Sequence, residues 1–262
     1  MGSVQTQELV IFSDNSVLSK ELCSGGSHNL ITITSSPSNS PFWLINALVE
    51  SKITGSPHSL SGASQPAPHG TSSDLPVTIG SFIHNGRQFT DVLKKLKIDA
   101  NSYRVVDLLT DFVAKNIGKP RAKVLSELLD AFTEAPSSMI VLEQPEILLT
   151  LLDGLTSDEL HRKFILPLMT KCGILLISTN ICYSLDGDNR DSVQFARFAS
   201  GCLYKSIAVL SLRPLETGRA TDVTGSLRIT RGGTSSTQIS CHVVENEYLY
   251  LNQRDSTKLF YR

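Results

Sequence analysis

The sequence is poor in charged residues and has no long apolar run. Asp, Glu, Lys and Arg make up 19% of the 262 residues, where about 25% is usual in soluble domains. One explanation for a surface with so few charges is a constitutive partner that covers part of it. No apolar segment approaches the roughly 18 residues of a membrane-spanning helix, and the opening MGSVQTQELV shows no basic-then-apolar signal. We therefore expect a cytoplasmic protein, with the nucleus left open, and no membrane contact.

The sequence also lacks the spacings of metal and covalent-catalysis sites. Its five cysteines form no CxxC pair and no metal-ligand spacing with histidine, and its six histidines contain no HExxH motif. Reduced thiols in a core explain the cysteines. The DGDNRD stretch that begins at Asp186 resembles a calcium loop only superficially, because Arg190 stands at a ligand position. We expect no catalytic residue, no metal and no cofactor.

What is present, up to Asn180, is an alternation of short apolar β-rich runs with helical runs. Strands are expected near residues 8–12, 29–34, 77–85, 103–109, 139–143 and 172–178, and helices near 42–53, 90–96, 111–116, 121–132 and 157–169. Strands that alternate with helices in this way predict an α/β fold with a mostly parallel central sheet covered on both faces.

The last third of the chain has a different pattern. Five short alternating runs, at 206–212, 225–231, 238–244, 248–252 and 257–262, are separated by Gly, Asn and Asp turns with no space for crossover helices. This predicts that the chain ends as an antiparallel meander. A parallel α/β core followed by antiparallel strands is typical of RecA-like ATPase domains, although other mixed α/β folds share it.

One segment does not fit a packed core. Residues 54–76 hold three Gly, four Pro and six Ser, with Asp74 as their single acidic or basic charge. Such a composition cannot bury enough apolar surface to order itself. We expect a single domain over residues 1–262 with a disordered Ser/Pro-rich insertion at 54–76.

The loop from Ser35 to Pro41 lies where a nucleotide-binding α/β protein carries its phosphate loop, between a buried strand and a helix. A working phosphate loop needs glycines, so that backbone N–H groups can surround the phosphates, and a lysine for their charge. This loop has neither, and Pro37 and Pro41 have no N–H to donate. The two interpretations are a degenerate nucleotide site and an ordinary turn of an unrelated fold.

Glu143 is the candidate acid at a strand end. In an active nucleotidase, an acid there would hold Mg²⁺ or orient the attacking water. A structural explanation also exists, because the helix that Pro145 opens would stabilise a carboxylate at its N-terminus. Without the lysine, we favour the structural explanation and keep an active hydrolase with an unorthodox phosphate loop as the alternative.

A local excess of basic residues is the remaining functional signal. The segment from Arg190 to Arg231 contains seven basic residues and three acidic residues. Arginines near loops and glycines can hold a phosphate backbone, although solvated strand edges would explain them as well. The candidate nucleic-acid-binding residues are Arg190, Arg197, Arg219, Arg228 and Arg231.

Long segments of the chain resemble the fungal form of the Elongator protein 6 family. They are MGSVQTQELVIFSD, SHNLITIT, INALVES, IVLEQPEILLTLLDGLTSDEL, DVTGSLRITRGG and VVENEYLYLNQRDSTKLFYR. The resemblance implies a RecA-like domain without a working phosphate loop, in a ring with two copies each of Elongator proteins 4, 5 and 6. The resemblance also implies that this ring is attached to the catalytic Elongator core, which modifies the wobble uridine of certain tRNAs. The ring is expected to bind tRNA and to release the tRNA in an ATP-sensitive way.

Three functional hypotheses follow. The first is a non-catalytic ring subunit that serves tRNA modification, with nucleotide binding supplied by its neighbours. The second is an active nucleotide hydrolase that uses Glu143. The third is a structural assembly subunit with no RNA role. No individual residue role transfers from the resemblance, because the family signature here is the loss of the phosphate loop.

Overall fold

The computed structural model describes residues 6–7, 28–55, 57–61, 77–116, 118–181, 190–215, 218, 220–234, 243–253 and 256–261. Its strands are β1 (Thr6–Gln7), β2 (Asn29–Ser35), β3 (Val77–Ser81), β4 (Tyr103–Asp107), β5 (Ala135–Glu143), β6 (Cys172–Asn180), β7 (Ala208–Arg213), β8 (Gly225–Arg231), β9 (Asn246–Asn252) and β10 (Thr257–Tyr261). Its α-helices are α1 (Phe42–Thr54), α2 (His58–Ser61), α3 (Gly86–Lys95), α4 (Thr110–Asn116), α5 (Arg121–Asp130), α6 (Leu148–Leu151), α7 (Ser157–Leu160), α8 (Leu166–Thr170) and α9 (Arg190–Lys205).

All ten strands belong to one sheet, in the order β1-β10-β9-β8-β7-β2-β6-β5-β3-β4. The strands from β7 to β4 in this order pair in parallel, and β8, β9, β10 and β1 extend the sheet in antiparallel pairs. Strand β2 lies in the middle, and all seven of its residues are buried. The run NLITIT predicted this strand correctly, because isoleucine and threonine are β-branched residues that favour strands.

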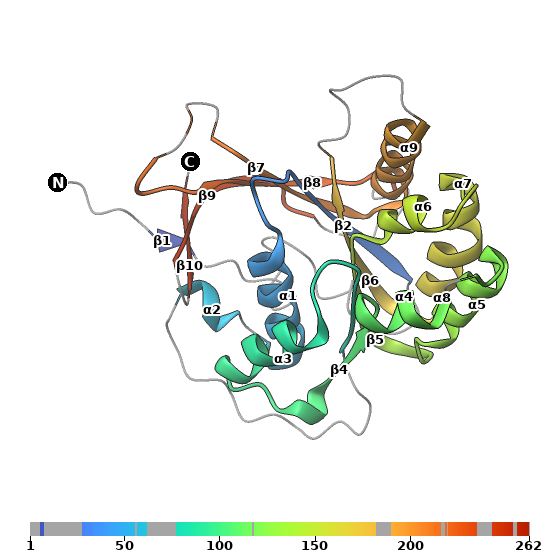
Figure 1. Cartoon of the computed structure of the whole chain (residues 1–262). Helices are drawn as coiled ribbons and strands as arrows, with labels where there is room; N and C mark the ends of the chain where they lie inside the picture. The colour runs from blue at the N-terminus through green and yellow to red at the C-terminus, as the bar shows by residue number, and fades with distance from the viewer. Residues whose placement is uncertain are drawn as a thin grey trace.

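Helices cover the two faces of the sheet as two separate groups. One apolar cluster joins α1 and α3 to alternate strand residues such as Ile31 and Leu227, and a second joins α5 and α9 to the intervening residues such as Leu30. Figure 1 shows α1, α2 and α3 together, apart from the group that runs from α4 to α9. The predicted α/β class with a mostly parallel sheet and C-terminal antiparallel strands is confirmed, and the fold is RecA-like.

The prediction for the last third of the chain missed one element. A 16-residue helix, α9, precedes β7. The predicted antiparallel run is confirmed from β7 to β10, and the other side of β7 pairs in parallel with β2. The sequence holds the signal for α9, because Phe195, Phe198, Ala199 and Cys202 recur at helical spacing and the last three are buried. The expected strands at 8–12 and 238–244 lie outside the described residues, apart from Val243 and Val244.

The start of the expected insertion is structured. Thr54 completes α1, and α2 follows with Leu60 only 3% exposed within the cluster that contains α1. One leucine in a polar segment is thus enough to place a short helix against the core. Residues 62–76, the rest of the expected insertion, lie outside the described residues.

Candidate functional site

Polar side chains gather at one edge of the parallel part of the sheet. Strands β3, β5 and β6 end there, and their registers place Ser81 beside Glu143 and Glu143 beside Ser178. The loop that follows β2 leaves from the same edge, because Ser35 is paired with Asn180. In open α/β sheets, ligands bind outside the carboxyl ends of the strands. This edge is therefore the place to test for a nucleotide site.

The loop at 36–41 is held by its own contacts. The Asn39 amide N–H donates to the Ser36 carbonyl at 2.9 Å, and the Asn39 side-chain amide donates to the Tyr250 hydroxyl at 2.6 Å. At the start of α1, the Phe42 N–H points to the Ser40 hydroxyl at 3.3 Å. Together with the two prolines, these contacts remove backbone donors that a phosphate would need.

The loop also offers no positive charge. No lysine or arginine occurs from Ser35 to Pro41, and the single basic residue of α1, Lys52, lies in its last turn. The start of a helix attracts an anion at an exposed site by about 1 kcal/mol or less. That is far below what tight binding of a triphosphate requires, so the geometry supports a degenerate phosphate loop.

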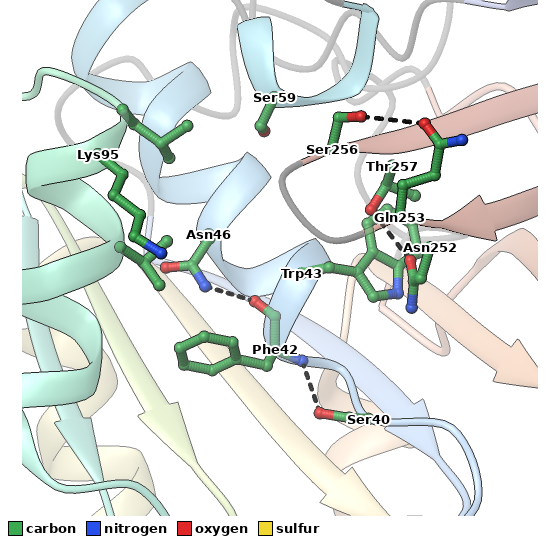
Figure 2. Close-up of a pocket in the computed structure, with 12 residues that line it drawn as sticks. Ser40, Phe42, Trp43, Asn46, Ser59, Lys95, Asn252, Gln253, Ser256 and Thr257 are labelled. Carbon is green, nitrogen blue, oxygen red and sulfur yellow. Dashed lines mark hydrogen bonds between the residues drawn. The ribbon is translucent and has the colours of Figure 1, made fainter.

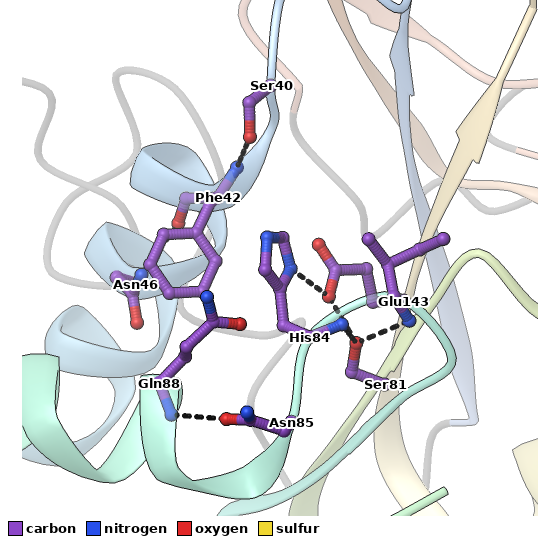
Figure 3. Close-up of polar contacts among 9 residues, drawn as sticks. Ser40, Phe42, Asn46, Ser81, His84, Asn85, Gln88 and Glu143 are labelled. Atoms are coloured by element: carbon purple, nitrogen blue, oxygen red, sulfur yellow. Dashed lines mark hydrogen bonds and ion pairs between the residues drawn. The ribbon is translucent and has the colours of Figure 1, made fainter. Parts of the chain in front are cut away.

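Glu143 is fully buried and is bound by residues that the sequence analysis did not connect to it. Its Oε2 accepts hydrogen bonds from the Ser81 hydroxyl at 2.5 Å and from Nδ1 of His84 at 2.8 Å, as Figure 3 shows. The Ser81 oxygen in turn accepts the N–H groups of Ile83 and His84. The carboxylate is therefore held by the end of β3 and the turn after it, rather than by the helix start that we expected.

Glu146 is a second buried acid at this edge. It has no exposed surface, and its Oε1 accepts the Asn180 N–H at 2.8 Å. Burial raises the pKa of its carboxyl to about 7; the Asn180 N–H lowers the pKa and the nearby Glu143 charge raises it further. A carboxyl that is half protonated near neutral pH destabilises the folded state when it ionises. No sequence motif identified Glu146 as a buried acid.

The link between these two acids is strained. Gln144 has a φ of 49°, in the left-handed region that residues with a side chain rarely adopt. Its N–H donates to the Ser178 carbonyl at 2.9 Å, which holds the unusual conformation in place. The strain turns the chain sharply from β5 into the 3-10 turn at Pro145–Ile147, so that both acids face the same edge.

Four of the five candidate arginines lie in a helix or a strand, whereas the sequence suggested loops. Arg190 and Arg197 belong to α9, and Arg228 and Arg231 belong to β8. Arg197, Arg228 and Arg231 are exposed, but alternation along β8 directs Arg228 and Arg231 to opposite faces of the sheet. Arg219 lies outside the described residues, and so does the side chain of Arg190. Among the described side chains, Arg228 and Arg231 thus do not share one face.

Within the described part of the chain, no group of three or more His, Cys, Asp or Glu residues is placed to hold a metal ion. Cys172 and Cys202 are free and buried, as expected of core thiols. Among the same residues, no helix has the length and apolar character needed to span a bilayer.

Comparison with known proteins gives one sequence relative and one structural neighbour of interest. No protein-family model matches the chain. The chain is 46% identical over 275 aligned residues to Elongator complex protein 6 of Saccharomyces cerevisiae, and the alignment covers 100% of both chains. The chain belongs to the Elongator complex protein 6 family.

The structural neighbour agrees with the fold. The flagellar accessory protein FlaH from Methanocaldococcus jannaschii superposes with a TM-score of 0.55, covering 98% of this chain and 100% of that one. At 13% identity the likeness concerns the fold alone. It agrees with the RecA-like fold that the sequence predicts for this chain.

Proposed function

We propose that the chain is a single-domain, non-catalytic RecA-like subunit of a ring of six built with Elongator proteins 4 and 5. In that ring, attached to the Elongator catalytic core, it supports tRNA binding and the modification of the wobble uridine. The observation that carries the non-catalytic part is the loop at 35–41, which has no cation, two prolines and internal hydrogen bonds. Its role is to provide contacts, while neighbours bind nucleotide.

Exposed apolar side chains at the carboxyl edge of the sheet support the assembly. Ile83, Leu109 and Ile181 follow β3, β4 and β6, and each is 37% to 42% exposed. Apolar residues that recur along one rim are typical of a protein interface. A neighbouring subunit that covers this rim would also bury the edge of the site around Glu143. The low charged fraction of the chain agrees with such covered surfaces.

Arg197, Arg228 and Arg231 remain the candidates for RNA contact. All three are exposed, and none takes part in an ion pair between described residues. A guanidinium group without an acidic partner is available to a phosphate. Because Arg228 and Arg231 do not share one face of the sheet, we propose that these residues act with basic residues of neighbouring subunits.

The test uses the ring assembled from Elongator proteins 4, 5 and this chain. Titration with tRNA at several salt concentrations gives the slope of log affinity against log salt. Replacing one phosphate-contacting residue, as in Arg228→Ala or Arg231→Ala, should lower that slope by about one and weaken all tRNAs alike. Arg87→Ala, an exposed arginine of α3, is the matched control.

The outcomes separate the three hypotheses. A ring that assembles but retains tRNA equally at all salt concentrations contradicts the RNA role and leaves a structural subunit. The hydrolase would be favoured if the isolated chain binds ATP with micromolar affinity and Glu143→Ala abolishes that binding.

A further inference from the structure

A cavity of about 570 Å³ opens between α1, α3, the end of β9 and the start of β10 (Figure 2). Its volume lies within the roughly 300–1,000 Å³ of small-molecule sites. Phe42 lines it, and the Phe42 ring centroid is 4.6 Å from that of His84. The cavity therefore adjoins the site around Glu143 but is distinct from it, because Glu143 is not among the lining residues.

A buried polar atom on the cavity wall lacks a partner. Asn46 is 4% exposed, and its Nδ2 donates to the Phe42 carbonyl at 2.8 Å. Its Oδ1 is buried and accepts no hydrogen bond from any described residue. Buried acceptors are nearly always satisfied, so one that faces a cavity indicates a donor supplied by a bound molecule.

The remaining wall combines apolar side chains with one cation. Phe42, Val92 and Leu96 give an apolar surface against which a ring can lie. In Figure 2, the Lys95 ammonium and the Asn46 side-chain oxygen point toward one another. Lys95 is exposed and pairs with no acid among the described residues. Lys95 is the single lysine or arginine among the described lining residues, and one ammonium suits a monoanion better than a polyphosphate.

We propose that this cavity binds a small aromatic carboxylate that carries an N–H donor. The ring lies on Phe42 and Leu96, the donor satisfies Oδ1 of Asn46, and the carboxylate pairs with Lys95. This site is additional to the proposed ring function and does not depend on it, because it needs neither tRNA nor a neighbouring subunit.

The test is a titration of the full chain with 4-aminobenzoate, which has a ring, an N–H donor and a carboxylate. Trp43 lines the cavity and is the single tryptophan of the chain, so one indole N–H signal in a proton–nitrogen NMR spectrum reports binding. Benzoate, which lacks the donor, should bind about tenfold more weakly because Asn46 stays unpaired. Aniline lacks the charge and should also bind more weakly.

Matched variants test the assignment of each group. Lys95→Gln should weaken 4-aminobenzoate about fivefold and leave aniline unchanged, since the lost attraction is that of an exposed ion pair. Lys94→Gln changes a neighbouring exposed lysine outside the cavity and should have no effect. Asn46→Leu should remove the preference for 4-aminobenzoate over benzoate.

Three results would overturn the proposal. They are an unchanged Trp43 signal at millimolar 4-aminobenzoate, equal binding of the three probes, and equal effects of the Lys94 and Lys95 variants. Failure of tRNA binding by the ring would not affect this proposal. Failure of 4-aminobenzoate binding would likewise not affect the proposed ring function.

Discussion

Replacing Glu146 with glutamine tests the electrostatics of the sheet edge most directly. The Glu146 pKa rises from its ordinary value of 4.5 to about 7 in the folded chain, mainly because the carboxyl is buried. Between these two pH values the folded state holds more protons than the unfolded state. The free energy of unfolding therefore falls as the pH rises through this window.

The size of the effect follows from the difference between the two pKa values. It corresponds to roughly 3 kcal/mol of stability that the wild-type chain loses between pH 4.5 and about 7. Glutamine carries no charge and keeps an oxygen that can accept the Asn180 N–H. We therefore expect Glu146→Gln to match the wild type near pH 4.5 and to be more stable by up to this amount at pH 8.

Urea unfolding of both chains at several pH values between about 4.5 and 8 measures this difference. Groups that do not interact with Glu146 contribute equally to both chains and cancel in the comparison. His161, whose pKa is lowered by burial, is one of them. Glu134→Gln, which changes an exposed carboxylate, is the matched control and should follow the wild type. Stability curves for Glu146→Gln and the wild type that run parallel across the window would refute the reasoning.

Three further substitutions test packing, each by chemical unfolding against the wild type. Tyr250→Phe removes the acceptor of the buried Asn39 amide and should cost about 1–2 kcal/mol; an unchanged stability would show that the loop does not depend on this bond. Gly201→Ala places a methyl group against the His161 ring and should cost roughly 1–3 kcal/mol, whereas a neutral result would mean that the ring can move aside. Leu60→Ala should cost roughly 2–4 kcal/mol if α2 is packed on the core, and a loss below 1 kcal/mol would contradict that packing.

Much of the fold could be predicted from the sequence because its parallel strands are buried on both faces. Continuous apolar runs such as 172–178 and 139–143 identify such strands without knowledge of their neighbours. The missed helix α9 has a local signal as well, which the excess of basic residues around it obscured. For the packing of α2, the sequence contains no local signal beyond Leu60. Whether one leucine is buried depends on elements that are distant in the sequence.

By itself, the sequence determined which phosphate-binding groups the loop from Ser35 to Pro41 lacks. Proline has no N–H and the loop has no ammonium group, and both are covalent facts that no tertiary contact can reverse. Only the tertiary structure decided which groups bind Glu143 and which arginines share a face. Ser81 and Glu143 are 62 positions apart, and the register that pairs β3 with β5 brings them together. Register is fixed by the packing of the whole sheet, so a local sequence pattern does not contain it.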